Sequence, residues 1–235
     1  MTNNMRFAVL TIFVYLLYSC SLNDDFNKDD VVNALYNKHD RRLLDYDAVM
    51  DRNKQLIWHE EFDDNDSKWP IDVTIDQCLI VIDGSLMGRS DYLIPFSRSY
   101  QMPVMLEQNK NYEIEINVNA GTGQIISLHN PDYAGNNGVI PASQIYILVL
   151  KNEGNKHSLA LGNGFPQIYS SEKHWLSDRF NRITIRKIGN KYAFFINSNF
   201  FYILNKTDFI GKAAMIWMNN NTKIDYVRFW LLNLP

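Results

Sequence analysis

Hydrophobic and polar positions divide the chain into three stretches with different patterns. Residues 7–18 (FAVLTIFVYLLY) form an almost uninterrupted apolar run. Residues 21–55 are polar and charged, with apolar positions only loosely at helical spacing, which predicts a tether with one or two short helices. From residue 56 onward, short alternating or wholly apolar segments are separated by glycine, asparagine and other turn residues, a pattern typical of strands.

The third stretch predicts an all-β sandwich. Residues 112–119 alternate apolar and polar side chains, and residues 145–150 are apolar on both faces, as in a central strand. Segments 182–188 and 191–197 flank Gly189-Asn190, a two-residue hairpin turn. Further strands are expected at 56–62, 79–83, 103–107, 123–129, 157–162, 200–204, 213–218 and 223–230. Many short strands, with no long helical period, favour two antiparallel sheets packed face to face.

The apolar run near the N-terminus is typical of an export signal. It follows Arg6 and is too short to cross a bilayer, which needs ~20 residues. A positive start, a short apolar core and a small residue, Ser19, at the cleavage point describe a secretory signal. Residues 17–20 (LYSC) also resemble the bacterial lipobox, in which cleavage precedes a lipidated cysteine, here Cys20.

The lipobox resemblance implies a diacylglyceryl thioether and an N-acyl chain on Cys20. One acyl chain binds a membrane marginally, at ~0.8 kcal/mol per buried CH₂, and two or more hold stably. We therefore expect an exported, membrane-anchored lipoprotein, in the outer membrane or at the cell surface if the cell is Gram-negative. An ordinary cleaved signal, with Cys20 there by coincidence, is the alternative.

These patterns predict three regions: a signal peptide at 1–19, a lipidated tether at 20–55 and a sandwich domain at 56–235. The chain has two cysteines, Cys20 and Cys78. Acylation of Cys20 would leave Cys78 without an intrachain disulfide partner. Cys78 begins the apolar run 78–82, so we expect a buried, inert thiol.

Charge narrows the class of partner. The chain has 23 Lys and Arg against 26 Asp and Glu, a formal net charge of −3. Nucleic-acid binding calls for a basic patch, which this balance does not suggest. The partner expected from these features is the membrane, through the anchor on Cys20.

Several segments, taken in order, resemble the concanavalin A-like lectin and glucanase superfamily. They are residues 57–64 with Trp69, 112–116, 181–197 and 224–230, so the resemblance covers roughly residues 56–233. It implies a jelly-roll sandwich of two antiparallel sheets. It does not settle activity, because this fold hosts lectins, glucanases and modules with neither function.

Catalysis is the sharpest question that this resemblance raises. Glycoside hydrolase family sixteen places Glu-x-Asp-x-Glu on one strand, and retaining enzymes hold their two carboxyls ~5–5.5 Å apart. The nearest match is Glu113-Ile-Glu115-Ile-Asn117, in which Asn117 stands where the proton donor should be. A carboxamide cannot act as acid and base, and the next strand, 144–148, carries no carboxylate. We therefore expect Glu113 and Glu115 to lie on the solvent-exposed face of a strand rather than to be catalytic.

Sugar binding would need aromatic faces beside hydrogen-bonding groups. The loops 130–137 and 164–175 offer both, with Tyr133, Tyr169 and Trp175 as ligand-binding candidates. Trp217 and Trp230 are expected in the core. No metalloprotease HExxH motif, GxSxG elbow or phosphate-binding glycine loop occurs.

A structural calcium ion is the one cofactor that the pattern suggests. Residues 63–66 supply oxygen donors, Asp64 among them, of the kind that calcium prefers. Asp225 resembles the last-strand aspartate that helps to hold calcium in family-sixteen enzymes. The alternative is a solvated turn, with Asp225 paired to a cation such as Arg228.

Together these features predict an exported lipoprotein that carries a non-catalytic carbohydrate-binding or interaction module. A diverged glycoside hydrolase acting on a β-glucan-like polysaccharide is one alternative. A structural or adhesive surface protein that uses a sheet edge is another.

Overall fold

A computed structural model describes the end of the second stretch and most of the third. The described residues are 39–65, 69, 72–73, 77–90, 97–119, 123–129, 145–151, 157–161, 167–171, 174–176, 178–205 and 212–235. Cys20 and Tyr133 lie outside them. The chain forms two compact units, Met1–Arg41 and Arg42–Pro235, and all fifteen described strands belong to the second. In the described part of the chain, no helix is both long enough and apolar enough to cross a membrane.

The sandwich unit begins earlier than the sequence suggests. Three short 3-10 turns, η1 (Arg41–Leu43), η2 (Tyr46–Ala48) and η3 (Asp51–Asn53), lead directly into the first strand, β1 (Lys54–Glu60). The Asp45 carboxylate caps η2 by accepting a hydrogen bond from the Asp47 amide at 3.0 Å. Residues 42–55, expected in the tether, therefore belong to the compact unit of the sandwich.

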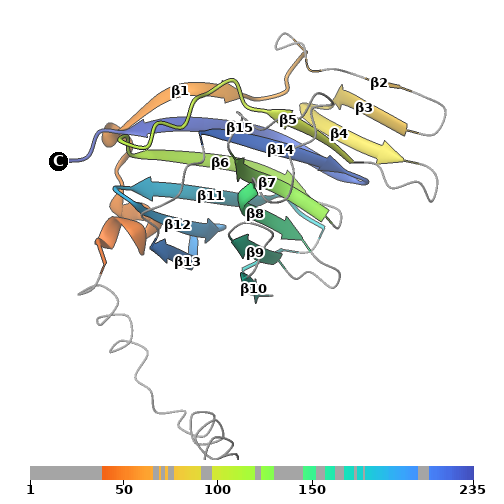
Figure 1. Ribbon diagram of the computed structural model, residues 1–235. Coiled ribbons are helices and arrows are strands. Elements are labelled where there is room, and N and C mark those ends of the chain that lie inside the picture. Colours follow the sequence, from red (N-terminus) through yellow and green to blue (C-terminus); the bar gives the residue numbers. More distant parts are fainter. Residues whose placement is uncertain are drawn as a thin grey trace, which may run out of the picture. The chain divides into compact units, whose positions relative to one another are not determined.

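In the described part of the chain, the larger sheet has nine antiparallel strands (Figure 1). Its order is β13-β12-β11-β6-β15-β4-β3-β2, and β1 also pairs with β15. The bounds are β2 (Asp72–Val73), β3 (Gln77–Ile82), β4 (Ser85–Ser90), β6 (Tyr112–Asn119), β11 (Asn181–Ile188), β12 (Lys191–Ile196), β13 (Asn199–Asn205) and β15 (Thr222–Leu232).

The smaller sheet has six antiparallel strands in the order β10-β9-β8-β7-β14-β5. They are β5 (Ser97–Gln101), β7 (Gly123–His129), β8 (Ile145–Lys151), β9 (His157–Leu161), β10 (Gln167–Ser171) and β14 (Ala213–Asn219). The interior position of β8, between β7 and β9, agrees with the apolar run 145–150 that makes up all but its last residue. The predicted sandwich of two antiparallel sheets is confirmed.

Tight turns join neighbouring strands where the sequence indicates them. Gly189, with φ of +59°, opens the predicted hairpin between β11 and β12. Asn197 and Ser198, with φ of +49° and +65°, turn β12 into β13. Positive φ at both central residues gives a turn whose twist matches that of the flanking strands.

The expected strand at 103–107 is wrong. The strand that pairs with β14 on the side away from β7 is β5, which ends at Gln101, just before Pro103. Proline has no amide hydrogen to donate and so interrupts a ladder. Beyond β5 the chain keeps contact with its neighbour through two isolated bonds, from the Met102 amide to the Ala214 carbonyl and from the Leu106 amide to the Lys212 carbonyl.

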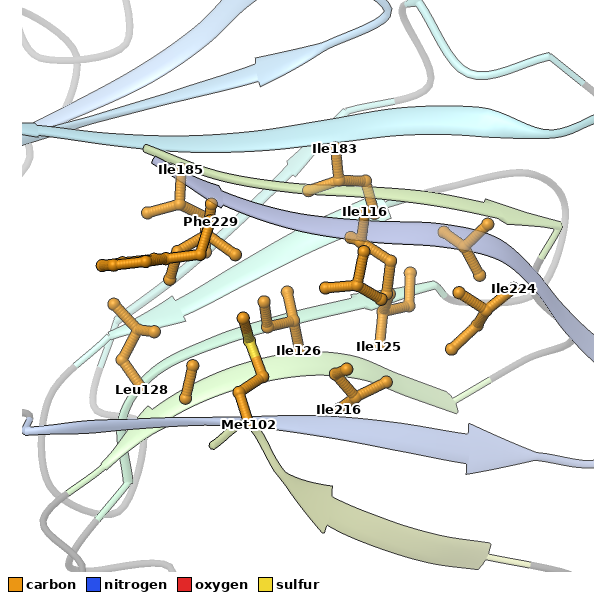
Figure 2. Packing of buried hydrophobic residues seen from close by; sticks show 14 of the residues in the cluster. Met102, Ile116, Ile125, Ile126, Leu128, Ile183, Ile185, Ile216, Ile224 and Phe229 are labelled. Carbon is orange, nitrogen blue, oxygen red and sulfur yellow. The ribbon is translucent and has the colours of Figure 1, made fainter. Parts of the chain in front are cut away.

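The core lies between the two sheets (Figure 2). Ile116, Ile183, Ile185, Ile224 and Phe229 come from the larger sheet and meet Met102, Ile125, Ile126, Leu128 and Ile216 from the side of the smaller one. All of these side chains are at most 2% exposed. Because successive strand residues point to opposite faces, this alternation also decides which side chains lie on the two outer faces of the sandwich.

Candidate functional site

Glu113 and Glu115 lie on the outer face of the larger sheet, yet they are buried. Their neighbours on β6, Ile114 and Ile116, belong to the core, so the two glutamates point the other way. They are only 0% and 3% exposed. The prediction of a solvent-exposed face is therefore wrong at these positions, and the reason is that residues 42–54 cover them.

Glu113 sits between two cations. Its carboxylate accepts hydrogen bonds from Arg186 Nε at 2.6 Å and from Lys54 Nζ at 2.7 Å. The side chains of Glu113 and Arg186 are both fully buried. A buried charge is tolerated when it is paired and hydrogen-bonded, which is the case for this glutamate.

Arg186 joins the sheet to the covering segment, residues 42–54. Its Nη1 donates to the carbonyls of Arg42 and Asp45 at 2.7 and 3.0 Å, and its Nη2 donates to the Tyr46 carbonyl at 2.8 Å. Beside it, Leu43 packs in a small apolar cluster with Ala193 and Phe195 of β12. The guanidinium thus fixes the backbone of the covering segment to a central strand.

Glu115 is held by two phenols. Tyr46 Oη donates to Oε2 at 2.7 Å, and Tyr226 Oη donates to Oε1 at 2.9 Å. Burial, followed by the negative charge of Glu115, raises the pKa of both tyrosines well above the usual value of 10.0, so each keeps its proton. Arg182 Nε lies 3.7 Å from the same carboxylate.

The Tyr46 ring completes this arrangement by lying among three cations. Lys54 Nζ is 5.3 Å from its centroid, and the guanidinium carbons of Arg182 and Arg186 are 4.8 and 5.3 Å away, within the range of cation–π attraction. We call the set formed by Glu113, Glu115, Arg182, Arg186, Lys54 and Tyr46 the Glu113 cluster. Its glutamates are enclosed and neutralised, so neither is available as a nucleophile or proton donor for a substrate.

The outer face of the smaller sheet carries a different set of side chains. Ile126 and Leu128 of β7, and Ala214, Ile216 and Met218 of β14, belong to the core. The intervening residues therefore lie on the outer face: Ser127, His129, Ala213, Met215 and Trp217. Register places Met215 opposite Ser127 and Ala213 opposite His129.

Trp217 is half-buried on this outer face rather than in the core, where the sequence analysis expected it. Its indole Nε1 donates to Ser127 Oγ at 2.9 Å, across from β14 to β7. The alternation of Ala214, Ile216 and Met218 with their neighbours is the sequence signal that could have placed Trp217 correctly.

His129 is fully buried on the same face. Among the described residues, neither ring nitrogen has a hydrogen-bond partner. Burial favours the neutral imidazole and lowers the pKa of His129 to about 4.

Carboxylates are missing from the strands of the smaller sheet. Within the described bounds of β5, β7, β8, β9, β10 and β14, the sequence contains no aspartate and no glutamate. β8 is the strand that follows β7 in the chain and pairs with it. These strands therefore cannot supply the pair of acids that glycoside hydrolysis requires.

The predicted ligand-binding aromatics have different outcomes. Trp175 is 7% exposed and belongs to the core cluster, so its assignment as a sugar platform is wrong. Tyr169 lies within β10, at the edge of the smaller sheet, rather than in a loop. Cys78 is a free thiol on β3 and is half-buried, less enclosed than its apolar neighbours suggest.

The predicted calcium donors do not form a site within the described residues. Asp225 accepts a hydrogen bond from Asn117 Nδ2 at 2.8 Å, and Asp64 is exposed. Arg228, suggested as a partner of Asp225, instead binds Glu61 through two bonds at 2.8 and 2.9 Å. In the described part of the chain, no three acidic, histidine or cysteine side chains gather as metal ligands would.

Comparison with solved structures supports the fold. No protein-family profile and no curated protein sequence matches this chain. Solved structures do match, among them a laminarinase from Flavobacterium sp. UMI-01, at 12% identity and a TM-score of 0.51 over 75% of this chain and 100% of that one.

Two further structures match comparably. SCLam, a non-specific endo-β-1,3(4)-glucanase from family GH16, is 11% identical with a TM-score of 0.50, over 76% of this chain and 91% of its own. An endo-β-galactosidase from Clostridium perfringens that releases GlcNAcα1-4Gal is 12% identical with a TM-score of 0.52, over 76% and 63%. Identities this low show a shared fold of two packed antiparallel sheets and nothing finer.

Proposed function

We propose that this chain binds a β-linked polysaccharide outside the cell without cleaving it. The observation that carries the proposal is the absence of any aspartate or glutamate from the described strands of the smaller sheet. The two glutamates of the larger sheet that sequence reasoning singled out are enclosed in the Glu113 cluster. The ligand class is supported by the solved neighbours, which are named as a laminarinase, an endo-β-1,3(4)-glucanase and an endo-β-galactosidase.

The second candidate is a diverged glycoside hydrolase that acts on a β-glucan. It is favoured by the names of the same neighbours, which are glycan-cleaving enzymes. It requires two carboxyls facing a substrate. Glu113 and Glu115 do not meet that requirement, because Arg186, Lys54, Tyr46 and Tyr226 already engage them.

Binding and hydrolysis can be separated with the same protein and the same polymers. The full chain, purified in detergent, is run through native gels containing soluble β-1,3-glucan, mixed-linkage β-1,3(4)-glucan or, as a matched control, an α-glucan. We expect the β-glucans to retard the protein and the concentration of reducing ends to stay constant. Absence of binding at millimolar sugar would reject the proposal, whereas reducing ends that grow with enzyme concentration would favour the second candidate.

We also propose that lipid on Cys20 anchors the chain to a membrane after export. Support comes from Arg6, the apolar run 7–18 and Ser19, which together have the form of a lipoprotein signal. Cells fed an azide-bearing palmitate should label the wild-type chain but not Cys20→Ser, which should also leave the membrane fraction. Cys78→Ser is the matched control and should keep its label. A Cys20→Ser chain that is still labelled would contradict the anchor.

A further inference from the structure

We propose that Trp217 is the platform on which a sugar ring of the polysaccharide stacks, and that Ser127 holds its indole in place. The inference rests on the proposed carbohydrate binding and assigns it to one face of the sandwich. That face is the outer face of the smaller sheet, on β7 and β14.

The strand alternation turns Trp217 away from the core. Figure 2 shows Ile126 and Ile216 pointing into the space between the sheets. Ser127 and Trp217 follow them in sequence and so lie on the opposite face. Trp217 is half-buried and keeps part of its surface exposed, whereas the residues before and after it, Ile216 and Met218, are fully buried.

The indole is fixed on this face by its one polar atom. Nε1 donates to Ser127 Oγ at 2.9 Å, and Ser127 is itself fully buried. A tryptophan whose N–H is already paired presents mainly apolar surface to a ligand. The C–H face of a pyranose is apolar as well, so covering one with the other removes both from water.

Charge favours a neutral sugar at this face. The described strands of the smaller sheet contain no acidic residue, and the outer-face residues around Trp217 on β7 and β14 are Ser127, His129, Ala213 and Met215. Burial keeps His129 neutral above a pH of about 4. These four side chains are buried beside the ring, at 0–7% exposure, so none of them brings a charge to the exposed part of Trp217.

Trp230 provides an internal comparison on the other outer face. It is half-buried, as Trp217 is, and it pairs in register with Glu113 of the larger sheet. Lys54 Nζ lies 5.4 Å from its ring centroid, so a cation from the Glu113 cluster already occupies one side of the indole. The two tryptophans therefore share burial and residue type and differ in what their rings contact.

The test compares four variants of the full chain in titrations with soluble β-1,3-glucan. Trp217→Ala should weaken binding by about tenfold, the size expected for loss of one aromatic contact, and Trp217→Phe by less. Ser127→Ala should weaken it by a smaller factor, because the ring stays but loses its fixed orientation. Trp230→Ala should bind as the wild type does.

A second readout does not depend on a destabilised alanine variant. Polysaccharide should change the tryptophan fluorescence of the wild type and of Trp230→Phe, and this change should disappear in Trp217→Phe. Thermal unfolding of each variant shows that it is folded. The inference is overturned if binding and the fluorescence change survive in Trp217→Phe and Trp217→Ala but fall in Trp230→Ala. The proposed function would still stand in that case. A wild-type chain that does not bind overturns both.

Discussion

Replacing Glu113 with glutamine should destabilise the sandwich rather than abolish a reaction. The change leaves two buried or nearly buried cations, Arg186 and Lys54, without the carboxylate that lies 2.6 and 2.7 Å from them. Arg186 remains hydrogen-bonded to the carbonyls of Arg42 and Tyr46. Its charged group therefore cannot move out into water.

The expected magnitude follows from the burial of the pair. Removing one partner of a buried ion pair costs about 3–5 kcal/mol, because the other charge stays uncompensated. Glutamine keeps one oxygen that can accept from Arg186 Nε, so the lower end of that range, about 3 kcal/mol, applies. This is a large part of the 5–15 kcal/mol by which a typical domain is stable.

Urea unfolding followed by circular dichroism measures the loss. A double-mutant cycle that combines Glu113→Gln with Arg186→Met should show that the two changes are not additive, with a coupling free energy of about 1–3 kcal/mol. The structural assignment of Glu113 would be refuted by a Glu113→Gln chain that unfolds within about 1 kcal/mol of the wild type while losing hydrolysis of a β-glucan.

Three further predictions concern the covering segment and the buried histidine. Tyr46→Phe removes the hydrogen bond to the Glu115 carboxylate and should lower the free energy of unfolding in urea by about 1.5–3 kcal/mol, the usual value for a bond to a charged group. An unchanged urea midpoint would mean that the Glu115 carboxylate does not need this bond. Between pH 6.5 and a pH of about 4 the unfolded chain binds a proton at His129 that the folded chain does not, so stability should fall as the pH drops, by about 3 kcal/mol over that interval. The same titration of His129→Leu should lack this contribution, and equal slopes for both chains would contradict it. A chain that begins at His39 should unfold cooperatively on heating, whereas a chain that begins at Leu56 should lose the cooperative transition. A stably folded chain that begins at Leu56 would show that residues 42–55 are dispensable.

The architecture could be predicted because its determinants are local. Alternation along 112–119, the apolar run of β8 and the turn at Gly189-Asn190 each depend on residues that are neighbours in sequence. Their order along the chain was enough to indicate two antiparallel sheets. The same local reasoning failed at 103–107, where Pro103 ends the ladder that the apolar pattern seemed to continue.

The state of Glu113 and Glu115 could not be predicted because it depends on distant parts of the chain. Arg186 bonds to carbonyls 140 to 144 residues before it, and Tyr46 reaches Glu115 across 69 residues. An alternating strand looks the same in sequence whether water or another segment covers its polar face. Trp217 is different, because its alternation with Ile216 and Met218 is visible in the sequence and could have placed it on the outer face, although it was expected in the core.

The central claim, binding without cleavage, is tested most directly by one calorimetric titration with a chemical readout on the same sample. The full chain is titrated with soluble β-1,3-glucan, and the recovered mixture is assayed for new reducing ends after prolonged incubation. A saturable heat of binding and a constant number of reducing ends are expected. A steady rise in reducing ends, or no heat at millimolar sugar, would contradict it.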